Sequence, residues 1–166
     1  MTERIAVRIE TGDFDPGAEF RRLGERTGGA GAIGCFLGIV RNEVGGRPIT
    51  AMTLEHYPAM TERAVRAVAV EAMRRWPLLG VTVLHRVGRL APGEHIVLVL
   101  AAAPHREPAL AATSFLIDWL KTKAPFWKKE HFTDGTAAWV AAQAADAAAA
   151  ARWTARETPS GDRALA

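Results

Sequence analysis

A segment of twelve residues, 120–131, concentrates side chains that can transfer protons or bind anions. It holds a proline, two large aromatic residues, one acid, Glu130, and four lysines, which are Lys121, Lys123, Lys128 and Lys129. Its charge of 4 − 1 = +3 equals the formal charge of the whole 166-residue chain, so the remainder is close to neutral. Positive charge beside aromatic rings can hold an anion, or it can lower the pKa of a lysine until that lysine exchanges protons near neutrality. Both uses predict a site here.

Two of these lysines have a structural interpretation as well as a functional one. Lys121 lies near the end of an expected helix, where the macrodipole favours a cation for purely structural reasons. Lys128 falls in a short extended piece, where it either pairs with Glu130 or faces a ligand while Glu130 orients it. Composition does not decide between these interpretations.

Further basic residues lie at or near the ends of expected strands. His105 and Arg106 fall where a strand meets a helix, and the N–H groups of such a helix start form an anion receptor together with an imidazole and a guanidinium. Arg41 follows an apolar strand, where a solvated arginine is the more frequent outcome. His56 and His85 lie within expected strands and are interpreted as structural, because a neighbouring carbonyl commonly satisfies such side chains.

Several other kinds of chemistry lose support from the sequence. No pair of His, Cys, Asp or Glu residues has metal-ligand spacing, and there is neither a phosphate-binding glycine loop nor a serine nucleophile elbow. The single cysteine, Cys35, lies in an apolar run, so we expect a small core residue in a reducing cytoplasm. The absence of a signal peptide and of a bilayer-spanning run predicts a soluble, unexported protein.

The strands that must position these residues are predicted from alternating and β-rich runs. They cover residues 4–10, 32–40, 49–57, 81–87 and 95–102. The last two are joined by a segment of turn composition and are expected to form an antiparallel pair. Residues 126–132 are also expected to be extended, with Lys128 and Glu130 on one face and Lys129 on the other.

Apolar residues at helical spacing predict the helices. These run from Pro16 to Arg26, over 58–76 and over 107–124. In the third helix, Leu110, Ile117 and Leu120 are expected to lie in a buried stripe. The chain length suits one core, so we expect a single domain over 1–140, followed over 141–166 by an alanine-rich helix and a frayed tail.

Taken in order, five parts of the chain closely resemble the family of large, catalytic subunits of molybdopterin synthase. These parts are residues 36–42, 54–60, 85–88, 105–106 and 120–130, and the resemblance extends over about residues 31–140. Each part is weak alone, but their order and spacing make a specific match. The alanine-rich tail after Val140 departs from the family pattern.

That resemblance implies an α+β fold of the α/β hammerhead type, with an antiparallel or mixed sheet, two long helices and a lysine-bearing segment after the second. It also implies a homodimer within a heterotetramer, in which each large subunit receives the C-terminal Gly-Gly thiocarboxylate of a small ubiquitin-like sulfur-carrier subunit. The implied substrate is cyclic pyranopterin monophosphate, which takes up two sulfurs to form the molybdopterin dithiolene. No cofactor, nucleic acid or membrane is implied.

Carried over position by position, the resemblance makes Lys121 and Lys128 the catalytic residues. The implied contacts to substrate or anion come from the side chains of Arg41, His105, Arg106, Lys129 and Glu130 and from the backbone of Ile39 and Val40. Phe36 and Ile117 are implied to line the pocket for the partner's tail. The chemistry is consistent, because arginine binds phosphate by its fork geometry and lysine can protonate a leaving oxygen or stabilise developing charge.

Two functions of other classes stay open. The chain could be a non-catalytic docking module for a ubiquitin-like protein, which shares the partner but makes no product. It could also bind single-stranded nucleic acid, with Phe126 and Trp127 as stacking platforms among the lysines. The second is less favoured, because there is only one compact basic patch and few aromatic residues lie elsewhere.

Overall fold

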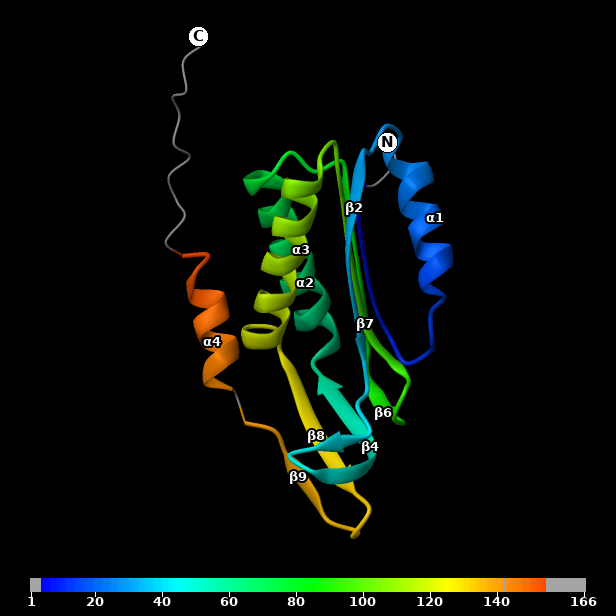
Figure 1. Ribbon diagram of the computed structural model, residues 1–166, viewed down its shortest axis with the longest axis vertical. Coiled ribbons are helices and arrows are strands. Elements are labelled where there is room, and N and C mark those ends of the chain that lie inside the picture. The colour runs from blue at the N-terminus through cyan, green and yellow to red at the C-terminus, as the bar shows by residue number, and fades with distance from the viewer. Residues whose placement is uncertain (1–3, 142, 155–166) are drawn as a thin grey trace.

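Two β-sheets and four helices form the part of the chain that the computed structural model describes, residues 4–141 and 143–154 (Figure 1). The first sheet has the order β1-β5-β7-β2. Its strands are β1 (Ile5–Glu10), β5 (Gly80–Arg86), β7 (His95–Ala103) and β2 (Ala32–Ile39). Strand β1 runs parallel to β5, whereas β5, β7 and β2 pair antiparallel, so the sheet is mixed.

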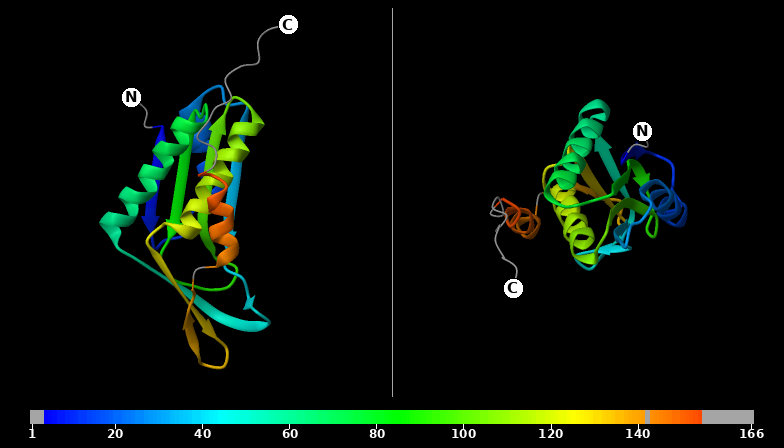
Figure 2. Two further views of the ribbon diagram at one scale, coloured as in Figure 1. Left: turned by 90° about the vertical axis from the view of Figure 1, so that its left-hand side faces the viewer. Right: turned by 90° about the horizontal axis from the view of Figure 1, so that it is seen from above.

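Helices cover both faces of the first sheet. Two long helices, α2 (Pro58–Arg75) and α3 (Arg106–Thr122), lie side by side on one face, and α1 (Pro16–Thr27) lies on the other (Figures 1 and 2). Because both faces are covered, all seven residues of β5 are buried. The helix boundaries follow local signals: the Asp15 side chain accepts a hydrogen bond from the Gly17 N–H at 2.8 Å, and Gly28 ends α1.

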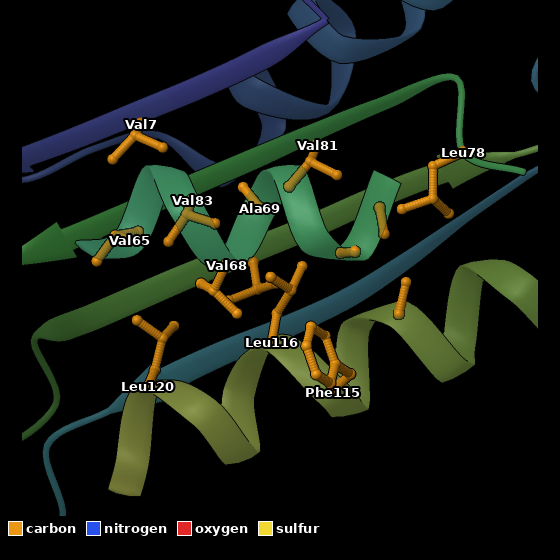
Figure 3. Packing of buried hydrophobic residues seen from close by; sticks show 14 of the residues in the cluster. Val7, Val65, Val68, Ala69, Leu78, Val81, Val83, Phe115, Leu116 and Leu120 are labelled. Carbon is orange, nitrogen blue, oxygen red and sulfur yellow. The ribbon is translucent and has the colours of Figure 1, made fainter. Parts of the chain in front are cut away.

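The largest core cluster lies between the two long helices and the sheet. Val65 and Val68 of α2 and Leu116 of α3 pack against Val81 and Val83 of β5 (Figure 3). Val65 and Val68 are three residues apart on one face of α2, and Val81 and Val83 are two residues apart on one face of β5. Their burial stabilises the fold by the hydrophobic effect, at about 25 cal/mol for each Å² of apolar surface removed from water.

Gly34 allows α3 to lie directly on the edge strand β2. A Cβ atom at Gly34 would lie 2.4 Å from the Ala109 carbonyl oxygen and 2.5 Å from Thr113 Oγ1. Only a residue without a side chain therefore permits this approach. Because the start of α3 packs against the start of β2, the two elements run in the same direction and end at the same side of the molecule (Figure 1).

A second sheet lies at that side and carries most of the lysine segment. It has the order β3-β4-β8-β9, with β6 also paired to β4. Its strands are β3 (Glu43–Val44), β4 (Arg47–His56), β6 (Gly88–Leu90), β8 (Phe126–Phe132) and β9 (Ala137–Trp139). Chain reversal at Gly45 and Gly46, both at positive φ, joins β3 to β4.

The last described helix, α4 (Ala144–Ala151), packs against α3 (Figure 1). The alanine-rich run therefore forms a helix as expected, whereas the frayed tail expected beyond it lies outside the described residues. Within residues 4–141 and 143–154, no helix has both the length and the hydropathy required to cross a bilayer.

The predicted α+β class and the predicted helices and strands are confirmed, with four local differences. The first concerns Gly45 and Gly46, which suggest a hairpin-like excursion between the strands predicted over 32–40 and 49–57. The second of these strands pairs with β8 in the second sheet and not with the first. The second is that the short strands β3, β6 and β9 were not predicted, because two or three residues carry no periodicity.

The other two differences concern burial. The prediction that Cys35 is a core residue is wrong, because the residue is exposed. It lies on edge strand β2, and α1 packs on β5 and β7, so Cys35 is left uncovered between the partly buried Ile33 and Leu37. Leu110 was expected in the buried stripe but is 58% exposed, because Ala109, and not its neighbour, turns toward the sheet.

Candidate active site

The lysine segment is divided between the end of α3 and strand β8. Lys121 lies in the last turn of α3, where its side chain is half exposed at 52%. The N–H of Lys123 closes the helix on the Trp119 carbonyl at 2.8 Å, and Pro125 precedes the extended strand. Lys128 is the third residue of that strand.

Lys128 and Glu130 lie on one face of β8 and form an ion pair. Their strand neighbours on β4 are Leu54 and Met52, which are both buried. Lys128 Nζ lies 3.7 Å from Glu130 Oε1, with the lysine side chain 33% exposed and the carboxylate only 9% exposed. A nearly buried carboxylate needs a counter-charge, and Lys128 supplies it while its ammonium stays at the rim. The sequence left this pairing open, and the structure contains it.

Lys129 lies on the opposite face of β8. Its ammonium is 5.3 Å from the ring centroid of Trp139 on the neighbouring strand β9, within cation–π range. The structure therefore brings Lys128 and Glu130 together but turns Lys129 away from them.

An aromatic stack lies at the start of β8. Phe126 stacks on His85 of β5, with ring centroids 3.9 Å apart and an interplanar angle of 16°. Burial lowers the pKa of His85 to about 4, so this imidazole is neutral near pH 7, and its Nδ1 lies 2.8 Å from the Arg86 carbonyl oxygen. His56 also stacks on Phe126, more loosely, with ring centroids 6.2 Å apart. The stack joins the second sheet to the first, next to the lysines.

Lys121 also has a carboxylate within ion-pair distance. Lys121 Nζ lies 3.9 Å from Asp146 Oδ1 in the first turn of α4. Sequence reasoning missed Asp146, although it is the one acid within the alanine run and that signal was visible. Both lysines thus have a carboxylate within ion-pair distance, but the carboxylates come from different elements.

The residues at the end of β2 lie at the same side of the molecule as the lysines. Val40 is buried and is fixed by backbone hydrogen bonds, from its N–H to Glu94 and from the Gly93 N–H to its carbonyl, at 2.9 and 2.8 Å. Ile39 is 48% exposed, and Arg41, the next residue after Val40, is exposed. No hydrogen bond or ion pair holds the Arg41 guanidinium among residues 4–141 and 143–154, so it is available to an anion.

His105 and Arg106 lie at the other end of α3. Lys121 follows Arg106 by fifteen residues, which corresponds to about 22 Å along the axis of an α-helix. Both residues are exposed, and with Leu110 and Gly31 they line a hollow of about 830 Å³. Neither Lys121 nor Lys128 lines this hollow. Within one chain, the predicted site is therefore divided into two parts.

The two residues expected beside the partner's tail both contact the main core cluster. Phe36 of β2 and Ile117 of α3 are partly buried and pack against that cluster from facing elements. Among the described residues, no group of three or more His, Cys, Asp or Glu side chains could hold a metal ion.

Comparisons with known proteins agree on one family. A family model described as MoaE protein matches residues 9–123. A molybdopterin synthase catalytic subunit from Mesorhizobium japonicum is 50% identical over 148 residues, which is 89% of this chain and 92% of that relative.

Solved structures give the same result. A molybdopterin biosynthesis MoaE protein from Burkholderia ambifaria is 49% identical, with a TM-score of 0.77 over 90% of this chain and 98% of that one. A more distant structure, 21% identical with a TM-score of 0.68, covers 81% of this chain and 89% of that one. It is described as a complex of subunits 1 and 2 of the molybdopterin-converting factor from Helicobacter pylori, and at that identity it shows the fold alone.

Proposed function

The chain belongs to the MoaE family, and we propose that it acts as the catalytic subunit of a molybdopterin synthase. In this reaction a small ubiquitin-like subunit presents sulfur on its C-terminal Gly-Gly thiocarboxylate. The sulfur is transferred to cyclic pyranopterin monophosphate in two successive steps, and the cyclic phosphate opens as the dithiolene forms. The chain needs no cysteine nucleophile, because the sulfur arrives on the partner.

The observation that carries this proposal is the pair of lysines at the junction of α3 and β8. Lys121 and Lys128 each lie within 4 Å of a carboxylate, at 3.9 and 3.7 Å, so both ammonium groups are held near fixed points. A positioned ammonium can protonate a leaving oxygen and stabilise the negative charge that develops when sulfur attacks. The buried Glu130 orients Lys128 in this role, and Arg41 binds the phosphate as a planar fork.

His105 and Arg106 join this site only if a second copy of the chain supplies them. The distance of about 22 Å along α3 prevents one chain from placing its own Arg106 beside its own Lys121. Leu110, exposed next to these residues, is an apolar side chain of the kind that an interface covers. We therefore propose a homodimer in which each pocket takes its lysines from one copy and its His105 and Arg106 from the other.

The small subunit's tail is proposed to reach the lysines past Phe36 and Ile117. These side chains are partly buried on facing elements, and an extended Gly-Gly tail needs little room because it carries no side chains. Lys129, which contacts Trp139 on the other face of β8, contributes only long-range attraction for the anionic substrate. A cytoplasmic location is part of the proposal and is tested by cell fractionation.

The test is sulfur transfer by a Lys121→Ala variant. Purified variant is mixed with thiocarboxylated small subunit and cyclic pyranopterin monophosphate, and the dithiolene product is measured. We expect less than about 1% of the wild-type rate, because loss of a group that transfers protons costs 10² or more, with an unchanged thermal midpoint because the side chain is half exposed.

Lys123→Ala is the matched control. It removes an exposed lysine from the same segment, two residues away, and we expect it to retain most of the activity. Full activity of Lys121→Ala would contradict the proposal. Failure of the wild-type chain to turn over the pterin while it still binds the small subunit would favour a docking module.

A further inference from the structure

Helix α4 carries a single ionisable side chain, and that side chain contacts Lys121. Seven of the eight residues from Ala144 to Ala151 are alanine, and Asp146 is the eighth. Asp146 Oδ1 lies 3.9 Å from Lys121 Nζ, and the Asp146 side chain is 31% exposed. Alanine favours a helix but gives it no polar contacts, so Asp146 is the only residue of α4 that can act on a charged neighbour.

The position of α4 on α3 is fixed at its other end by Asp118. Arg152 Nη2 and Trp153 Nε1 both donate to Asp118 Oδ2 at 2.7 Å, and the Asp118 side chain is only 13% exposed. Trp153 is itself buried and packs edge-on against Phe115, at 5.6 Å between ring centroids. An isolated helix of eight residues is marginal in water, so α4 depends on this attachment.

The attachment also sets the direction of α4. Asp118 and Lys121 lie three residues apart on α3 and so share a face of that helix. The end of α4 lies at Asp118 and its beginning at Lys121, so α4 runs antiparallel to α3 (Figure 1). Attachment of α4 at Asp118 therefore places the Asp146 carboxylate next to Lys121.

We propose that Asp146 is a positioning residue for Lys121, held in place by the attachment of α4 to Asp118. Asp146 does not touch the substrate, and it acts by restricting the orientations of the lysine ammonium. A lysine side chain has many rotamers, and a fixed carboxylate reduces their number before the substrate binds. This inference rests on the proposed role of Lys121 in sulfur transfer.

A purely structural role for Asp146 predicts different behaviour. An acid in the first turn of a helix stabilises that helix through the macrodipole, wherever on the turn it lies. Ala147 is exposed and is the next residue of the same turn, about 100° around the helix. A carboxylate at residue 147 keeps the helix-start charge but points away from Lys121.

The experiment compares three variants in the complete assay with thiocarboxylated small subunit and cyclic pyranopterin monophosphate. Asp146→Asn is expected to lower kcat about fivefold, the effect of losing a partly exposed ion pair in the transition state, with a smaller change in KM for the pterin. Asp146→Glu is expected to restore at least half of the wild-type kcat. The double variant Asp146→Ala/Ala147→Asp is expected to behave as Asp146→Asn.

Two outcomes would overturn the inference. One is wild-type kcat in Asp146→Asn, and the other is wild-type kcat in the double variant, which would leave only a helix-start effect. Lys121→Ala, measured alongside, separates this inference from the proposed function. An inactive Lys121→Ala with a fully active Asp146→Asn removes only the role of Asp146, whereas a fully active Lys121→Ala removes the proposed function itself.

Discussion

The two ends of α3 differ in how completely one chain builds them. At the C-terminal end, Lys121 has Asp146 as a partner, and Lys128, on the strand that follows, has Glu130. At the N-terminal end, no ion pair or hydrogen bond holds the side chains of His105 and Arg106 within the described parts of the chain. One end is organised before any ligand arrives, and the other stays open beside a hollow of about 830 Å³.

This difference indicates a division of labour. Groups that act on reacting atoms need fixed geometry, and the proposed catalytic lysines obtain it from helices α3 and α4, strand β8 and two carboxylates. Groups that recognise a phosphate can be completed later by a second surface. The following predictions test whether the lysine end is organised in this way and whether α3 holds the two ends apart.

The largest effect is expected from substitutions on the two faces of β8. Lys128→Ala should lower the rate of dithiolene formation at least about 100-fold, because it removes a proposed catalytic ammonium and leaves Glu130 buried without its partner. Lys129→Ala should lower the rate no more than a few-fold, because its side chain faces Trp139. Steady-state kinetics on both variants checks this, and equal losses would show that the face of the strand does not matter.

Acid should lower the stability of the fold through His85, whose ring stacks on Phe126. Burial lowers the pKa of His85 from 6.5 to about 4. Between these two pH values, His85 binds a proton in the unfolded chain but not in the folded chain. The free energy of unfolding should therefore fall as the pH drops from 6.5 to 4, by about 3 kcal/mol from this residue. Urea unfolding at several pH values measures the slope.

A His85→Phe variant is the control for this pH dependence. Phenylalanine keeps a ring against Phe126 but cannot bind a proton, so its unfolding free energy should depend less steeply on pH over the same range. An identical slope in the wild type and the variant would assign the acid sensitivity to other groups.

A smaller effect is expected from a substitution at the close contact between α3 and strand β2. Gly34→Ala places a Cβ atom 2.4 Å from the Ala109 carbonyl oxygen, and relief of this overlap should cost about 2 kcal/mol of stability. Gly24→Ala is the matched control, because nothing lies within 4 Å of its Cβ position and it is in helix α1. The control should keep or slightly raise the thermal midpoint, and an equal loss in both would contradict the account of Gly34.

The sequence predicted the parts of this site better than their arrangement. The opposite faces of β8 follow from a period of two, and Pro125 and the helix pattern separate Lys121 from the strand. The distance between Arg106 and Lys121 could also have been predicted, because it follows from the length of the helix. The contact of Asp146 with Lys121 could not, because no local pattern in an alanine run tells which helix it will cover.

The exposure of Cys35 could not be predicted from the sequence for a similar reason. Its apolar neighbours gave no sign that its strand would be an edge, since strand order depends on long-range pairing with β7. Local periodicity assigns elements, whereas burial at an edge and contacts between helices depend on the assembled fold.

Complementation between two variants, each of which the proposed shared site predicts to be inactive, tests the central claim most directly. Lys121→Ala and Arg106→Ala are each purified, then mixed, unfolded and refolded together, so that about half of the dimers carry one copy of each variant. In such a mixed dimer one pocket has both substitutions and the other has none, so the mixture should recover about a quarter of the wild-type rate of dithiolene formation. No recovery from a mixture that demonstrably contains mixed dimers would contradict a site shared between the lysine end of one copy and the arginine end of another.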